Sequence, residues 1–136
     1  MIASNYSVML IAHGSRVGAA NAELVEIAEL LRASTTYTNV EVAYLELASP
    51  SLPEAAQLCV DNGACQVFMM PYFLSAGSHV TRDLEAFRQQ FSEQFADVEW
   101  ILCQPLGVHP QMITIISDRL KQAVQPTTDD DINERA

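Results

Sequence analysis

The sequence predicts an α/β fold, a four-stranded and mostly parallel sheet with helices on both faces. Four short apolar segments recur along the 136 residues, and a segment with helical spacing of apolar residues follows each of them. In such an alternation, each helix crosses over between two parallel strands. The length is typical of one domain, which we assign to residues 1–125. Residues 126–136 are polar and acidic and are predicted to form a flexible tail.

The first two strand–helix units occupy the N-terminal half. Residues 7–12 (SVMLIA) form a short apolar run, typical of a strand that is buried on both faces. Apolar residues at helical spacing predict a helix over 21–33. Residues 40–47 (VEVAYLEL) predict the second strand. Ser51 and Glu54 then form a capping box, which opens a helix that ends near the next glycine.

The last two units follow the same order. Residues 65–74 (CQVFMMPYFL) predict the third strand, and residues 81–95 predict a helix. Residues 98–103 (VEWILC) predict the fourth strand, and Pro110 opens the last helix. A stripe of aromatic residues on the third helix is expected to pack on the sheet or on a partner: Phe87, Phe91 and Phe95.

The composition excludes several classes of protein. Seventeen acidic and seven basic residues give a formal net charge of -10, which lacks the basic footprint of a nucleic-acid binder. No apolar run is long enough for a membrane-spanning helix, and the N-terminus lacks the basic region of a signal peptide. Three scattered cysteines argue against a disulfide framework, and they favour reduced, partly buried thiols. We therefore expect a cytoplasmic protein without nucleic-acid or membrane partners.

All three histidines follow predicted strands. His13 comes after the first strand, His79 after the third and His109 after the fourth, while Glu46 ends the second. Ligands of parallel sheets bind outside the carboxyl ends of the strands. Neutral imidazole binds Fe, Co, Ni and Zn, and it takes up protons near neutral pH. This edge is therefore the candidate site.

The loops also show a weak internal echo. A shift of 63 residues places Gly14 and Ser15 on Gly77 and Ser78, and it places Glu46 on a histidine. Two related half-units would explain the match. Coincidence would also explain it, because only a few positions match. Residues 14–18 (GSRVG) are neither a phosphate-binding loop nor a nucleophile elbow, so Ser15 is expected to act in a turn or cap.

Five segments carry a resemblance to a known family. They are LIAHGSR (10–16), YLEL (44–47), MPYFL (70–74), GSHVTRD (77–83) and PLGVHP (105–110). With them the chain resembles the short form of the CbiX/SirB family of class II tetrapyrrole chelatases over about residues 8–124. The specific signal is the combination of two motifs, AHGSR after the first strand and PYFLxxGxHVxxDL.

The resemblance implies a flavodoxin-like or chelatase-like fold and an enzyme. Its reaction would be the ATP-independent insertion of Co²⁺ or Fe²⁺, or of Ni²⁺ in some archaeal relatives, into sirohydrochlorin or a close relative. The product would enter sirohaem or cobalamin biosynthesis, and the sequence does not select the metal or the pathway. The divalent metal would be a substrate, with no tightly bound cofactor. Short members of this family are expected to pair as homodimers.

The resemblance also implies roles for individual residues. His13 and His79 would hold the metal, and Glu46 with a histidine would accept the displaced pyrrole protons. Apolar and aromatic side chains would pack on the ring, while arginines and helix N-termini would bind its carboxylates. The predicted substrate-binding residues are Ser15, Arg16, Tyr72, Phe73, Leu74, Gly77, Ser78, Val80, Arg82 and His109. Among these, His109 is also expected to act as a helix cap or in the wall of a pocket.

Other functions stay open at this point. The same pocket could serve a non-enzymatic carrier of a tetrapyrrole or a metal. A flavodoxin-like binding module with incidental histidines is a second alternative, although the glycine-poor edge loops count against a nucleotide ligand. A histidine phosphotransfer enzyme is the weakest alternative, because the arginine–histidine–glycine order that it needs is missing.

Overall fold

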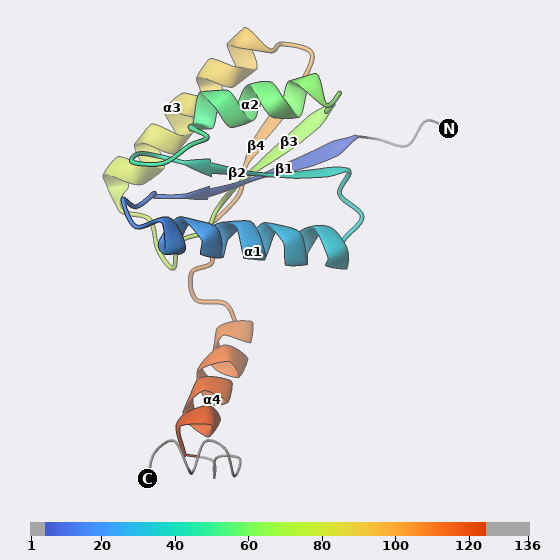
Figure 1. The fold of residues 1–136 in the computed structure, drawn as a ribbon. Coiled ribbons are helices and arrows are strands. Elements are labelled where there is room, and N and C mark those ends of the chain that lie inside the picture. The colour runs from blue at the N-terminus through green and yellow to red at the C-terminus, as the bar shows by residue number, and fades with distance from the viewer. Residues whose placement is uncertain (1–4, 125–136) are drawn as a thin grey trace.

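The computed structural model describes residues 5–124, in which four strands and four helices alternate (Figure 1). The strands are β1 (Tyr6–Ala12), β2 (Asn39–Tyr44), β3 (Gln66–Pro71) and β4 (Glu99–Leu102). The helices are α1 (Gly18–Ser34), α2 (Leu52–Asp61), α3 (Ser78–Gln94) and α4 (Gln111–Val124). The strands form one sheet in the order β2-β1-β3-β4, and every pairing is parallel. The predicted fold class is confirmed.

The central strand β1 is buried along most of its length. It pairs with β2 on one side and with β3 on the other, so that Ala12 lies beside Tyr44 and Ile11 beside Pro71. Residues 7–11 are all buried. This burial on both faces explains the continuous apolar run of this strand, which differs from the alternation of a half-exposed strand.

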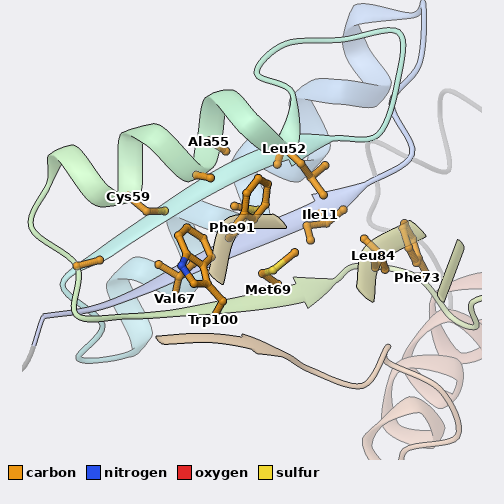
Figure 2. Packing of buried hydrophobic residues seen from close by; sticks show 14 residues of the cluster. Ile11, Leu52, Ala55, Cys59, Val67, Met69, Phe73, Leu84, Phe91 and Trp100 are labelled. Atoms are coloured by element: carbon orange, nitrogen blue, oxygen red, sulfur yellow. The ribbon is translucent and has the colours of Figure 1, made fainter. Parts of the chain in front are cut away.

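Helices cover the two faces of the sheet unequally. Helix α1 packs on β1 and β2 from one face, while α2 and α3 pack on the other, as Figure 1 shows. The larger core lies under α2 and α3, where Phe91 and Trp100 meet with ring centroids 5.0 Å apart (Figure 2). Phe91 is fully buried, and Phe87 and Phe95 pack around the same core. The predicted packing role of this aromatic stripe is therefore confirmed.

The capping box of α2 is present as the sequence predicts. The Oγ atom of Ser51 accepts a hydrogen bond from the backbone N–H of Glu54 at 3.3 Å. The backbone N–H of Ser51 donates in return to the Glu54 carboxylate at 2.8 Å. These bonds hold the pKa of Glu54 below its usual value, because they favour the charged carboxylate.

Element boundaries differ from the prediction at functional positions. The second strand ends at Tyr44, and residues 45–47 turn away with Leu47 at a φ of +65°. Helix α3 begins at Ser78, three residues before the first residue predicted for it. Both differences lie at the carboxyl edge of the sheet, where loop contacts decide the backbone path more than local pattern does.

The last helix departs from the expected layering. None of the residues of α4 is buried, and the helix stands apart from the sheet in Figure 1. One half of the sheet consequently has a helix on only one face. The predicted tail, residues 126–136, lies outside the described residues. No helix within residues 5–124 is long and apolar enough to cross a membrane.

The three cysteines are free thiols in different surroundings. Cys59 is buried, Cys103 is half-buried and Cys65 is exposed. Burial raises the pKa of Cys59 to about 12, with a smaller contribution from the nearby negative charge of Glu41. The thiol of Cys59 is thus held in its protonated, unreactive form.

Truncation of Phe91 tests the larger core. Phe91→Ala is expected to lower the free energy of unfolding by about 3–5 kcal/mol, since it leaves a cavity among fully buried side chains. Chemical denaturation monitored by circular dichroism measures the change. Glu93→Ala, at an exposed position of the same helix, should change it by less than about 0.5 kcal/mol. Equal effects of the two substitutions would contradict this account of the core.

Thiol labelling tests the burial of Cys59. A water-soluble thiol reagent at pH 8 should modify Cys65 in the folded protein and leave Cys59 unmodified, because only the former is exposed. Peptide mass spectrometry identifies the labelled residue, and labelling in denaturant provides the control. Equal labelling of both cysteines in the native state would show that the Cys59 thiol is not buried.

Candidate active site

The loops that follow β1 and β2 run side by side beyond the sheet. The backbone N–H of Leu45 donates to the carbonyl of Ala12 at 3.0 Å, and that of Glu46 donates to the carbonyl of His13 at 2.9 Å. The first bond completes the parallel ladder of the two strands, and the second holds the two loops together beyond it. They place His13 and Glu46, which are 33 positions apart in the sequence, next to each other.

Gly14 makes this close approach possible. Its φ is +96°, a conformation that residues with a side chain rarely adopt. A Cβ atom at this position would lie 1.8 Å from the carbonyl oxygen of Glu46. The glycine that interrupts the first apolar run is thus required by the contact between the two loops.

Phe73 supports the imidazole of His13. The two rings are stacked, with centroids 4.4 Å apart and planes inclined by 26°. Phe73 is 7% exposed and belongs to the larger core, whereas His13 is exposed. One face of the imidazole therefore rests on a rigid surface, and its nitrogen atoms remain accessible.

A cleft of about 550 Å³ opens beside His13, between the strand-end loops and α3. On the loop side it is lined by His13, Leu45 and Glu46, of which the histidine and the carboxylate are exposed. On the helix side it is lined by Val80, Asp83, Ala86, Phe87 and Gln90. The cleft thus brings together one imidazole and two carboxylates on an apolar base.

Asp83 is the residue that the sequence-based assignment of the site omitted. It lies on α3 three residues after Val80 and four before Phe87, so these residues share one face of the helix. This spacing was visible in the sequence. What the sequence did not reveal is that this face of α3 turns partly toward the loops after β1 and β2.

A second set of contacts secures the loop after β1. The backbone N–H of Ser15 donates to Oδ1 of Asn21 at 2.9 Å, and Nδ2 of Asn21 donates to the Ser15 carbonyl at 2.7 Å. The hydroxyl of Tyr44 donates to the Asn21 carbonyl at 2.7 Å. The Ser15 hydroxyl accepts from the N–H of Val17 at 3.0 Å. Ser15 thus acts in a turn, as predicted from the sequence.

The candidate residues that follow β3 line three separate surfaces. Val80 lines the cleft, whereas Ser78 and Arg82 line a separate depression on α3. Tyr72 and Leu74 line a groove on the α1 face of the sheet. Phe73, between Tyr72 and Leu74 in the sequence, is buried in the larger core.

The remaining candidate residues do not line the cleft. His79 is exposed in the first turn of α3, one turn before Asp83, and does not line the cleft. Arg16 is exposed, and Gly77 is the N-cap of α3 with extended backbone. His109 accepts a hydrogen bond at Nδ1 from the N–H of Gln111 and lines the groove. His109 therefore combines the two roles of cap and wall.

The charges in the cleft favour a cation. Glu46 and Asp83 line it, and no arginine or lysine does. Within residues 5–124, no group of three histidine, cysteine or carboxylate side chains stands close enough to enclose a metal ion. The arrangement can hold a cation loosely beside His13 and leave coordination positions open, and its carboxylates can accept protons.

Comparison with known proteins assigns the chain to a family. The CbiX family model matches residues 7–123, and the chain belongs to this family. It is 32% identical over 117 residues to the chloroplastic sirohydrochlorin ferrochelatase of Arabidopsis thaliana. This alignment covers 86% of this chain and 52% of that protein. It is 26% identical to the sirohydrochlorin cobaltochelatase of Methanopyrus kandleri, over 87% of this chain and 96% of that protein.

Solved structures agree with this assignment. A putative cobalamin biosynthesis CbiX protein from Marinobacter aquaeolei superposes with a TM-score of 0.76 at 27% identity, covering 90% of this chain and 99% of that one. SirB from Bacillus subtilis, solved with Fe³⁺, shares the fold with a TM-score of 0.80 at 23% identity. The chain covers 48% of SirB. It thus spans about half the length of its longer relatives and nearly all of the shorter ones.

Replacement of Gly14 tests the contact between the two loops. Gly14→Ala is expected to lower the free energy of unfolding by more than about 1 kcal/mol, since the added methyl group meets the Glu46 carbonyl at a positive φ. Thermal unfolding measures the loss. Gly18→Ala is the matched control, because nothing lies within 4 Å of a Cβ atom there. A Gly14→Ala variant as stable as this control would refute the proposed constraint.

Proposed function

We propose that this chain inserts a divalent metal, Co²⁺ or Fe²⁺, into sirohydrochlorin or a closely related tetrapyrrole without ATP. The observation that carries the proposal is the pairing of His13 with Glu46 over Phe73, in a cleft that a second carboxylate also lines. Relatives named sirohydrochlorin ferrochelatase and sirohydrochlorin cobaltochelatase support the reaction and its substrate. The metal is a substrate in this scheme, and no tightly bound cofactor is needed.

The reaction sets two chemical tasks. The ion must lose part of its hydration shell, and two pyrrole N–H protons must leave as the metal–nitrogen bonds form. A site with few protein ligands suits the first task, because the macrocycle nitrogens must occupy the remaining coordination positions. Bases beside the metal suit the second task.

The chain's own residues divide these tasks. A nitrogen of His13 binds the incoming ion, and its stacking on Phe73 keeps the ring oriented toward the cleft. Glu46 accepts a pyrrole proton, and Asp83 is a second acceptor across the cleft. Both carboxylates also attract the cation. We retain His79, which is exposed one helical turn before Asp83, as a second metal ligand.

The tetrapyrrole substrate needs partners of opposite charge. Its peripheral carboxylates would be repelled by Glu46 and Asp83 inside the cleft, so they must lie at the rim. Arg16 and Arg82 are exposed outside the cleft and are assigned to them, since guanidinium groups bind carboxylates in a bidentate manner. We assign the contact with the ring to the apolar residues of the lining, Leu45, Val80 and Phe87.

A homodimer completes the proposal. A single open α/β layer offers one wall to a large flat macrocycle, and a second copy would supply the other. The difference in length among the relatives supports this view, because this chain covers about half of some and nearly all of others. We retain the cytoplasm as the predicted location.

An insertion assay tests the proposed activity. Purified protein should accelerate the absorbance change of sirohydrochlorin with Co²⁺ or Fe²⁺, with Ni²⁺ as a third metal to compare. His13→Ala and His79→Ala should each reduce the rate at least about 100-fold, the usual scale for an acid–base or ligand group. Glu46→Gln should reduce the rate to a similar extent. Glu93→Gln is its control, because Glu93 is an exposed carboxylate on α3 outside the cleft.

The same assay separates the enzyme from a carrier. A carrier would bind sirohydrochlorin or the metal stoichiometrically without accelerating insertion above the uncatalysed rate. Such a result would reject the proposed activity. Full activity of His13→Ala would reject the assignment of the site.

A further inference from the structure

The loop that carries His13 needs support from outside. Gly14 follows the histidine directly, and glycine moves between backbone conformations more freely than any other residue. His13 itself is exposed, so burial does little to fix it. Its stacking on Phe73 holds one face of the imidazole but does not restrain the backbone of the loop. The position of His13 therefore depends on bonds to the backbone on either side of it.

On its N-terminal side the loop is fixed by the sheet. The backbone N–H of Glu46 donates to the carbonyl of His13 at 2.9 Å. Beyond this bond the pairing ends, because neither backbone group of Ser15 bonds to the backbone of another residue within 5–124. Ser15 is half-buried, so its two groups need partners within the protein.

The side chain of Asn21 supplies both partners. Its Oδ1 accepts from the backbone N–H of Ser15 at 2.9 Å, and its Nδ2 donates to the Ser15 carbonyl at 2.7 Å. One planar amide thus holds both polar backbone groups of a single residue, two positions after His13. Only an amide fits this arrangement in full, since one of its atoms must accept and the other must donate.

Asn21 is itself anchored to the core. It is the fourth residue of α1, and the hydroxyl of Tyr44 donates to its carbonyl at 2.7 Å. Tyr44 is 3% exposed and ends β2, two residues before Glu46. It also lies against the loop, because a Cβ atom on Gly14 would be 3.3 Å from the Cβ of Tyr44. One buried side chain therefore joins Asn21, the loop and the strand that leads to Glu46.

Helix α1 alone gives no reason for an asparagine at this place. Asparagine is a poorer helix former than alanine, which occupies the positions on either side of it. Both hydrogen bonds of its side chain go to Ser15, outside the helix. Val17, the N-cap of α1, makes no side-chain capping bond. Asn21 therefore serves the loop more than the helix.

We propose that Asn21 is a positioning residue for His13. By holding both backbone groups of Ser15, it fixes the C-terminal end of the loop, as the bond from Glu46 fixes the other end. The imidazole then stays stacked on Phe73 and faces the cleft before the metal arrives. The inference rests on the proposed function, because His13 is the metal ligand of that reaction.

Two substitutions separate this role from stabilisation of α1. Asn21→Ala removes both bonds to Ser15. Asn21→Asp keeps the acceptor and loses the donor, and at about pH 8 its carboxylate faces the Ser15 carbonyl with like charge. A negative charge near the N-terminus of a helix favours the helix, so Asp would serve a merely structural residue at least as well. Thr35→Val is the matched control, since it removes one side chain–backbone bond at the other end of α1.

Nuclear magnetic resonance of the metal-free protein reports the position of His13 directly. Its imidazole protons lie over the face of the Phe73 ring, which shields them, so they should resonate upfield of those of His79 and His109. His13→Gln identifies these signals among the three histidines. Asn21→Ala and Asn21→Asp should lose most of the upfield displacement, and Thr35→Val should keep it. In the insertion assay with Co²⁺, both Asn21 variants should lower kcat about 10-fold or more.

The two measurements distinguish the possible failures. His13 signals that stay in place in both Asn21 variants would overturn the inference. Signals that move without a loss of kcat would overturn it as well, because the position of the ring would then not matter to the reaction. An Asn21→Asp variant that keeps both properties would show that Asn21 only supports α1. If the unsubstituted protein inserts no metal, the proposed function fails, and the His13 signals alone decide whether Asn21 holds the ring in place.

Discussion

The parallel pairing of β1 with both of its neighbours is the interaction on which the rest of the structure depends. It requires a strand that is apolar on both faces, and residues 7–11 supply one. Parallel strands end at the same edge, so the loops after β1, β2 and β3 emerge together. The bond from Leu45 to Ala12 completes the ladder of β1 and β2, and the bond from Glu46 to His13 holds their loops together beyond it. The site is therefore built directly on the ends of the paired strands.

Two residues turn that shared edge into a chemical site. Gly14 lets the first loop pass within contact of the Glu46 carbonyl, and Phe73 provides a buried ring beneath His13. Both are ordinary structural features with a functional consequence. Rigid support of this kind limits the movement of a catalytic group and reduces the entropy lost on binding. The charge of the cleft, in contrast, comes from two loop and helix carboxylates that face water.

Much of the fold and part of the site could be predicted from the sequence. The apolar runs, the helical periodicity and the capping box at Ser51 are local patterns, and the structure confirms each of them. His13 and Glu46 were predicted by their places after two strands, and they do line one cleft. Asp83 and Asn21 were missed, since their roles come from contacts with residues far away in the sequence. Tyr72 and Leu74 were predicted to contact the ring, and in the structure they line a groove on the other face of the sheet.

The sequence by itself determined the class of fold, the order of its elements and the edge of the sheet that holds the candidate site. These follow from short-range periodicity and from the rule that parallel strands end together. Only the tertiary structure decided which side chains share the cleft and which face the second groove, because each lining combines residues from elements that are distant in the sequence. It also decided the path of α4. Apolar residues recur along that helix, yet none of its residues is buried against its own sheet.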